Sequence, residues 1–223
     1  MSATTYDTKS KAYFEGARTD YVSAMPDDRH SSILEIGCAE GGTGVLALSR
    51  GKCARYVGIE LHRPSAEIAR TVLSEVHVGN IETMTLGFRS GEFDVVVISE
   101  VLEHLLDPWD VVARLSEYVR EGGLVFASSP NVSHYRVIRN LLKGRWELTE
   151  HGVMDRTHFR WFTPASYRDM FERAGFVIEE VRPVTPPSWR VKTLNNLTRH
   201  RLAHLFMVQI SVRGRKIRSA AAL

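Results

Sequence analysis

The chain has 223 residues, of which 43% are hydrophobic and 25% charged, and its formal net charge is +3. This composition is typical of a soluble globular protein, and no apolar run reaches the roughly 18 residues that a membrane-spanning helix needs. The N-terminus lacks the apolar stretch of a signal peptide. Two cysteines, Cys38 and Cys53, do not make a disulfide framework. The sequence therefore predicts a cytoplasmic protein without a membrane span.

Short apolar runs alternate with amphipathic segments along the chain, which is typical of an α/β fold with a mostly parallel sheet. The sequence predicts strands at 31–37, 55–60, 75–79, 93–99, 123–129, 176–181 and 204–212. It predicts helices between them at 42–50, 64–73, 108–119, 132–142 and 163–175. Pro64 suits a first helical turn, Thr163 suits an N-cap and Gly175 suits a C-cap, so these residues mark helix boundaries.

No linker or internal repeat divides the chain, so a single domain over 1–223 is expected. Its parts are an N-terminal helical cap (1–27), a core (28–182), and a C-terminal helix, strand and basic tail (183–223). Residues 9–25 form an amphipathic pattern that could lie over a cleft as a helix. Between Arg190 and Arg218 basic residues occur without any acid. That bias fits either an anionic partner or a solvated helix and tail.

A glycine-rich turn, ILEIGCAEGGTG at 33–44, follows the first predicted strand and opens a helix. Glycines let the backbone approach a ligand closely, and a helix N-terminus favours anionic groups. Dinucleotide-binding proteins share such turns. The hydride-transfer fingerprint from Gly37 is incomplete, however, because Ala39 stands at its second glycine position.

The segment SEVLEH (99–104) comes directly after the apolar run FDVVVI. In open α/β sheets the chemistry lies beyond the carboxyl ends of the strands. On a helical turn Glu100, Glu103 and His104 would share one face, because they stand at i, i+3 and i+4. Two close carboxylates repel each other unless a cation joins them, and this set suits Mg²⁺, Mn²⁺, Fe²⁺ or Co²⁺. Downstream, His158 is the natural candidate for a further ligand.

Several motifs, in order over about residues 30–182, together resemble those of class I S-adenosylmethionine (SAM)-dependent methyltransferases. Residues 35–41, Glu-Ile-Gly-Cys-Ala-Glu-Gly, resemble the first motif, and Glu60 resembles the acid that holds both ribose hydroxyls. Gly79-Asn80-Ile81 resembles the segment that recognises adenine. The resemblance implies a Rossmann-like fold with a mostly parallel seven-stranded sheet and helices on both faces. It implies SAM contacts at Glu35, Gly37, Cys38, Ala39, Gly41, Glu60, Leu61, Asn80, Ile81 and Ser99.

Two positions depart from the family pattern. Ala39 replaces the middle glycine, which is tolerable if its φ stays negative. Asn80 replaces the usual acid, and its amide oxygen can still accept a hydrogen bond from the adenine amino group. Neither change is expected to remove SAM binding.

The constellation Glu-x-x-Glu-His with a distant histidine resembles the metal site of small-RNA 2′-O-methyltransferases, and ubiquinone-pathway O-methyltransferases have a similar Glu-His pair. The resemblance implies divalent-metal ligands at Glu100, Glu103, His104 and His158. In many methyltransferases, however, Leu-Glu-His occurs here without a metal and merely caps or packs. Without a metal, His104 or His158 is the candidate general base. Asp155 is a further candidate for the acceptor pocket and for catalysis.

The acceptor atom is expected to be oxygen. The Asp/Asn-Pro-Pro-Tyr/Phe motif of amino-group methyltransferases is missing after the fourth predicted strand, and Cys38 belongs to the cofactor turn. Residues 130–163 resemble a bacterial group associated with glycan and secondary-metabolite assembly, which implies a hydroxyl on a sugar, glycan or secondary metabolite. Two alternatives remain: a 2′-O-methyltransferase of an RNA 3′-terminal ribose, and a non-catalytic SAM-binding partner subunit. The last predicted strand, 204–212, could be an edge for a homodimer.

Overall fold

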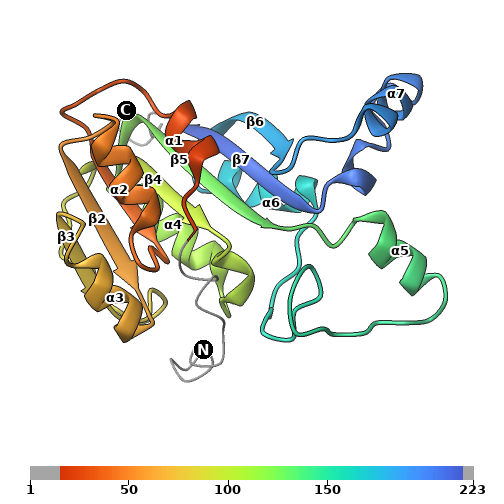
Figure 1. The fold of residues 1–223 in the computed structure, drawn as a ribbon, viewed down its shortest axis with the longest axis horizontal. Helices are drawn as coiled ribbons and strands as arrows, with labels where there is room; N and C mark the ends of the chain where they lie inside the picture. Colours follow the sequence, from red (N-terminus) through yellow and green to blue (C-terminus); the bar gives the residue numbers. More distant parts are fainter. Residues whose placement is uncertain (1–15, 218–223) are drawn as a thin grey trace, which may run out of the picture.

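A twisted seven-stranded sheet runs through the computed structural model, which describes residues 16–217 (Figure 1). Its strands are β1 (Ser32–Ile36), β2 (Arg55–Glu60), β3 (Glu75–Val78), β4 (Phe93–Ser99), β5 (Val119–Pro130), β6 (Phe176–Pro183) and β7 (Gln209–Lys216). The α-helices are α1 (Thr19–Ala24), α2 (Gly42–Ser49), α3 (Arg63–Ala69), α4 (Pro108–Tyr118), α5 (Tyr135–Leu141), α6 (Pro164–Arg173) and α7 (Trp189–Leu197). Two short 3₁₀ helices, η3 (Leu102–His104) and η4 (Ala203–Phe206), complete the described elements.

The strand order is β3-β2-β1-β4-β5-β7-β6. The first five strands in this order are parallel, and β7 is antiparallel to both β5 and β6. These pairings confirm the predicted Rossmann-like fold. The order reverses between β1 and β4, and ligands of such sheets bind at the carboxyl ends of the strands beside this reversal.

Helices bury apolar side chains against both faces of the sheet. On one face, buried residues of α4 and α6 pack in one core cluster with strand residues such as Val96 and Ile98. On the other, α1, α2 and α3 pack in a second cluster with Val95 and Val97. Alternate residues of β4 thus point into opposite cores, as the two-residue period of a strand requires.

Most predicted helices and strands are confirmed to within a few residues, and capping explains the sharpest boundary. Thr163 accepts a hydrogen bond from the Ser166 backbone N–H while the Ser166 side chain accepts from that of Thr163, which forms a capping box. Gly175 follows the same helix with φ +86°, a conformation that favours glycine. Of the predicted helix at 9–25, the structure contains α1, and residues 9–15 lie outside the described part.

The predicted position of the last strand is wrong. Residues 203–206 form η4, and the strand begins at Gln209. The second half of the strand is charged, so it lacks the apolar pattern by which strands were predicted. In the structure Arg213 and Arg215 pair with Glu179 of β6 at 3.2 and 2.6 Å. Since β7 lies between β5 and β6, it is not the free edge on which a homodimer was expected.

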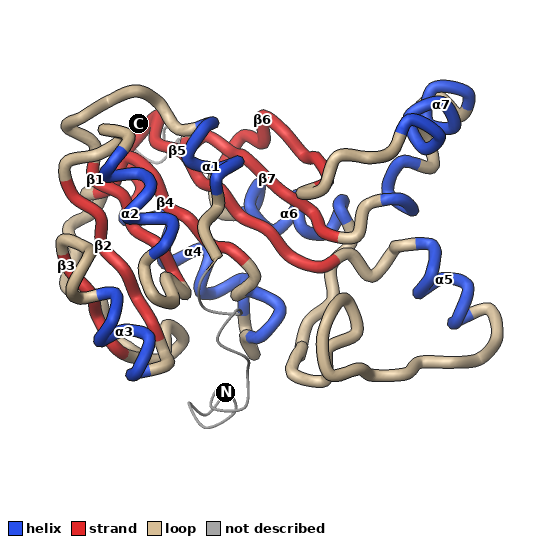
Figure 2. The backbone as a smooth tube through the Cα atoms, viewed as in Figure 1, coloured by secondary structure: helices blue, strands red, loops and turns tan. Residues whose placement is uncertain are grey.

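Beyond the carboxyl end of β5 the chain leaves the sheet, forms α5, and returns through a long loop to α6 (Figure 2). This loop carries Asp155 and His158 back toward the sheet. Its return is fixed by the carbonyl oxygen of Glu103, which accepts hydrogen bonds from the N–H groups of Phe159 and Arg160 at 2.8 and 3.0 Å. Within residues 16–217, no helix has the length and apolar character to span a bilayer.

Candidate active site

A cavity of about 1030 Å³ lies at the carboxyl ends of the strands. Of the residues predicted for the site, those that line it are Glu35, Gly37, Cys38, Ala39, Glu60, Leu61, Asn80, Ile81, Ser99, Glu100, Glu103, His104, Asp155 and His158. Gly41 is not among the lining residues. It has φ +87°, and its N–H donates to the carbonyl oxygen of Cys38 at 2.8 Å, so it shapes the turn.

The glycine turn brings the backbone of β1 close to Glu60. Gly37 has φ +71°, and a Cβ there would lie 2.6 Å from Cγ2 of Val101. Alanine at position 39 was expected to be tolerable if its φ stays negative, and this condition is not met, because its φ is +49°. The Ala39 N–H donates to Oε2 of Glu60 at 2.8 Å. The Cβ of alanine makes the left-handed conformation costly.

Glu60, at the end of β2, is only 7% exposed. Its other oxygen, Oε1, accepts the His62 N–H at 2.7 Å. Burial raises the pKa of Glu60, and these backbone donors oppose the shift. Each carboxylate oxygen has a second lone pair, so the side chain can still accept hydrogen bonds from the two ribose hydroxyls.

Two further polar side chains shape the same end of the cavity. Asn80 accepts the Glu82 N–H on Oδ1 at 2.9 Å, which fixes the amide orientation. Its predicted contact with adenine stays a prediction. Glu35 is buried and accepts a hydrogen bond from the Tyr56 hydroxyl at 2.9 Å. Burial raises the pKa of Glu35 to about 7.

Arg18 is a lining residue that sequence reasoning missed. Its Nη1 donates to the hydroxyls of Ser99 and Ser128, both at 2.6 Å, and its Nε donates to Asp20 at 2.9 Å. The guanidinium also lies 3.6 Å from the ring centroid of Tyr21. Its Nη2 also donates to Asp20, at 3.0 Å, so this carboxylate is held by two parallel hydrogen bonds. Arg18 belongs to no sequence motif. The only signal was its position in the helix that was expected to lie over the cleft.

The segment after β4 does not form the expected α-helical face. Glu100 has φ +55°, and only residues 102–104 form a 3₁₀ turn. The Glu100 carboxylate accepts a hydrogen bond from Nε2 of Gln209, a β7 residue, at 3.0 Å. Its role as a metal ligand stays a prediction.

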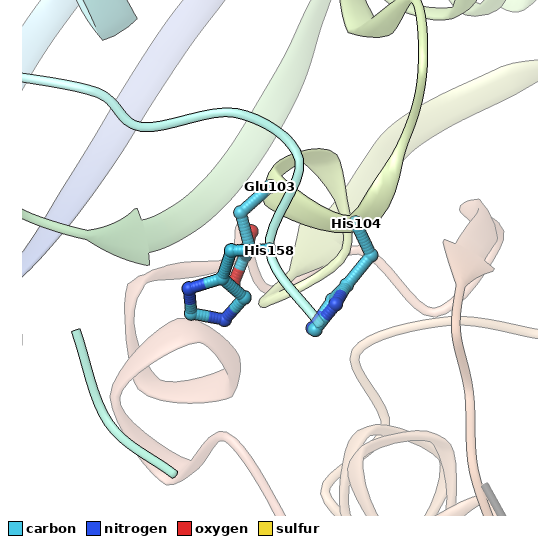
Figure 3. A group of neighbouring side chains, drawn as sticks. All are labelled: Glu103, His104 and His158. Atoms are coloured by element: carbon cyan, nitrogen blue, oxygen red, sulfur yellow. The ribbon is translucent and has the colours of Figure 1, made fainter. Parts of the chain in front are cut away.

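Glu103, His104 and His158 converge from two segments (Figure 3). Each can offer one ligand atom such that all three atoms lie within 4.8 Å of one another. The Nδ1 of His104 lies 3.1 Å from the carbonyl oxygen of Thr157, and the Nδ1 of His158 lies 3.2 Å from that of Val153. Because a carbonyl only accepts, a neutral imidazole in this position carries its proton on Nδ1 and its lone pair on Nε2.

Glu103 is 1% exposed. Its Oε2 accepts the Ser129 hydroxyl at 3.2 Å, whereas its Oε1 is buried without a hydrogen-bond partner. Burial, and then the nearby Glu100 carboxylate, raise its pKa well above the usual range. One carboxylate and two imidazoles whose ligand atoms lie this close together therefore fit a divalent cation, whose charge would offset the burial of Glu103.

Asp155 is buried, and its Oδ1 accepts two hydrogen bonds from Thr157, one from the N–H at 2.9 Å and one from the hydroxyl at 2.7 Å. Its predicted catalytic role stays a prediction. Thr157, which joins Asp155 to His104, lines the cavity, as its place beside Asp155 in the sequence suggested; Gln209, which holds Glu100, also lines it and was not singled out from the sequence.

Comparison with known proteins shows which family the sequence matches. The sequence model of a family described as "Methyltransferase domain" matches residues 11–181. The ubiquinone biosynthesis O-methyltransferase of Thiobacillus denitrificans is 32% identical over 162 residues, which cover 69% of this chain and 67% of that protein. The protein of the same name from Aromatoleum aromaticum is 28% identical over 205 residues, covering 87% and 85%.

Solved structures share the fold at low sequence identity. A SAM-dependent methyltransferase from Mesorhizobium loti is 16% identical, with a TM-score of 0.63 over 91% of this chain and all of that one. The [4+2]-cyclase SpnF has a TM-score of 0.62 at 17% identity over 90% and 81% of the two chains, so the fold alone does not fix the reaction. The family match and the curated relatives identify the reaction class: this chain belongs to the class I SAM-dependent methyltransferases and is an O-methyltransferase.

Proposed function

We propose that the enzyme transfers the methyl group of SAM to a hydroxyl of a small molecule that carries two neighbouring hydroxyls, such as a sugar of a glycan or a secondary metabolite. We further propose that Glu103, His104 and His158 hold a divalent cation during this reaction. The observation that carries the proposal is the buried, unpartnered Oε1 of Glu103 in a group where one ligand atom each of Glu103, His104 and His158 lies within 4.8 Å of the others.

One end of the cavity, at Glu60, binds SAM, and the other, at Glu103, binds the acceptor. Glu60 and the glycine turn hold the nucleoside of SAM. In the transfer, an acceptor oxygen bonds to the methyl carbon while the carbon–sulfur bond breaks, which leaves S-adenosylhomocysteine. Positioning of the two reactants in line supplies much of the rate enhancement.

The hydroxyl must also lose its proton. A divalent cation, when bound, lowers the pKa of a hydroxyl beside it. If the site works without one, Nε2 of His104 or His158 takes the proton directly. These two routes differ in their response to chelation.

The requirement for two neighbouring hydroxyls can be tested with pairs of acceptor molecules that differ by one hydroxyl. Methyl transfer from labelled SAM would be measured to a methyl glycoside with vicinal hydroxyls and to the matching deoxyglycoside. Because the relatives are named for ubiquinone biosynthesis, catechol and phenol form a second pair. Transfer to the diol but not to its single-hydroxyl partner is expected, and equal transfer within both pairs would contradict the two-hydroxyl requirement.

Chelation tests the cation separately. EDTA treatment followed by gel filtration should lower turnover about 100-fold, and added Mn²⁺ or Co²⁺ should restore it. Full turnover after chelation, in protein shown by elemental analysis to be metal-free, rules the cation out. A small RNA with a ribose or a 2′-deoxyribose at its 3′ end completes the panel, and transfer confined to the ribose-ended RNA would replace the small-molecule assignment.

A further inference from the structure

Helices α5 and α7 bury almost none of their side chains. Only Val137 of α5 and Asn195 of α7 are buried, whereas α4, which packs on the sheet, buries several apolar residues. Both helices project beyond the sheet at the same end of the molecule (Figure 1). The segment after α7 joins them, because the ring centroids of Tyr135 in α5 and Phe206 in η4 lie 6.0 Å apart. This end of the molecule therefore consists of helices with little support from the core.

These two helices carry the most exposed apolar side chains of the described chain. Leu142, at the end of α5, is 84% exposed, and Leu197 and Trp189 of α7 are 78% and 71% exposed. No other large hydrophobic side chain that the structure describes exceeds 57%. The helical period places Trp189, Leu194 and Leu197 on one side of α7, away from its buried residue. A cluster of exposed apolar side chains indicates a surface that contacts a partner.

Basic side chains accompany the apolar ones. Exposed basic residues on or next to the two helices are Arg136, Arg139, Lys143, Arg190, Lys192 and Arg199. None of these six forms an ion pair with another described residue, and Glu147, the first acid after α5, pairs with Arg145 at 4.0 Å. Together with the apolar side chains above, they form the α5–α7 patch, which is both apolar and positively charged.

We propose that the α5–α7 patch binds the surface of an anionic lipid bilayer, with its leucines and tryptophan among the headgroups and its basic side chains against the lipid charges. Leucine and tryptophan on one side of a helix, accompanied by lysine and arginine, are typical of helices that lie in a membrane interface. With 7 and 9 residues, α5 and α7 are too short to span a bilayer, so the contact is with its surface. The proposal does not depend on the acceptor or on a cation.

The combination of charge and apolar side chains favours a bilayer over two other occupants. A second copy of the chain would place one positive patch against another in a two-fold dimer, which is repulsive. RNA would be attracted by the charge but would gain little from exposed leucines, because bases stack on aromatic rings. An anionic bilayer attracts the basic side chains and also takes up the leucines.

Vesicle flotation with the full chain measures this binding. The probes are vesicles of about 30% phosphatidylglycerol in phosphatidylcholine, and vesicles of phosphatidylcholine alone, at about 0.1 M and about 1 M salt. Wild type should bind the anionic vesicles at least about tenfold more tightly than the neutral ones at the lower salt concentration. The higher concentration should reduce this difference, because it screens the charges.

Two double variants separate the apolar from the basic part of the patch. Leu142→Ser with Leu197→Ser should weaken binding to anionic vesicles about 100-fold, which is about tenfold for each leucine. Arg139→Gln with Lys192→Gln should weaken it about 25-fold, which is about fivefold for each charge. All four side chains are exposed, so the fold should be retained, and circular dichroism checks this.

Matched controls change the same kinds of residue on other surfaces. Ile68→Ser with Val177→Ser replaces two exposed apolar side chains, and Arg63→Gln with Arg89→Gln removes the same net charge as the basic variant. Both controls should bind vesicles within about threefold of wild type, because charges far from the patch are screened. The comparison separates the patch from the overall charge of the protein.

Absence of binding to anionic vesicles would overturn the proposal, as would binding that the patch variants weaken no more than their controls do. A dimer in sedimentation equilibrium, formed without vesicle binding and lost in the patch variants, would assign the patch to a second copy instead. A complex with RNA in a mobility-shift assay, under the same two conditions, would assign it to RNA.

Discussion

The two ends of the cavity satisfy their carboxylates differently. Glu60, at the SAM end, accepts a backbone N–H on each oxygen. Glu103, at the acceptor end, is just as buried but has one oxygen that no described group bonds. Both oxygens of Glu60 are therefore bonded by the protein backbone, whereas Glu103 keeps one oxygen for a proton or a further partner. Variants at the two ends should fail in different ways.

The largest effect is expected at the SAM end. Glu60→Ala removes two charge-assisted hydrogen bonds to the ribose and should weaken SAM binding about 1000-fold, measured by titration calorimetry. Glu75→Ala, which removes a half-buried carboxylate of β3 that pairs with Arg55 and does not line the cavity, is the matched control and should bind SAM normally. An affinity within tenfold of wild type in Glu60→Ala would mean that the ribose lies elsewhere.

The free-energy cost of burying the ionised Glu35 side chain can be measured from the pH dependence of unfolding. Its pKa is about 7 in the folded chain against an ordinary 4.5, so its stabilising contribution is full below pH 4.5 and is lost as pH rises toward 7. Glutamine does not titrate, so Glu35→Gln should gain about 3 kcal/mol of unfolding free energy relative to wild type across this window. Urea unfolding at several pH values measures the gain, and Glu67→Gln on exposed α3 should show none.

At the acceptor end the expected loss is in turnover. Glu103→Ala and His158→Ala should each lower methyl transfer about 100-fold while SAM affinity stays unchanged. His77→Ala, on β3, serves as the control for loss of a histidine. If Glu103→Ala weakened SAM binding as Glu60→Ala does, the division of the cavity into two ends would not hold.

The smallest effect concerns Ala39. Glycine has no Cβ to oppose its φ of +49°, so Ala39→Gly should stabilise the protein by about 0.5–1 kcal/mol in thermal or urea unfolding. Gly37→Ala is the opposite experiment on the same turn, because its new Cβ would lie 2.6 Å from Val101. It should be strongly destabilised, and equal stabilities of the two variants would contradict the turn geometry.

The residues expected to bind SAM could be placed at one cavity from the sequence because they lie in short motifs at the ends of successive strands. Glu60 closes β2, and the glycine turn closes β1. The contacts that prediction missed join residues far apart in the chain: Arg18 meets Ser99 and Ser128, and Gln209 meets Glu100. No local pattern encodes such pairs.

Local conformation was misjudged where tertiary contacts override it. Helical spacing in SEVLEH suggested an α-helix, but the N–H of Glu100 still pairs with the carbonyl oxygen of Ser128 on β5, and the chain then turns through φ +55°. The start of β7 was misplaced because residues 205–208 are apolar and resemble a strand, and its end was missed because Arg213 and Arg215, which pair with Glu179, are charged.

The internal place of β7 has a consequence for how the chain folds. Its two neighbours, β5 and β6, both precede it in the chain; β5 also pairs with β4, whereas β6 joins the sheet only through β7. Before residues 209–216 are made, β6 has no strand to pair with, although α6 can already pack with α4 in the same core cluster. The pairing of β5 with β7 joins residues far apart in the chain, and such non-local pairings fold slowly. Loss of this one strand would detach β6 as well, although neither strand contributes to the glycine turn.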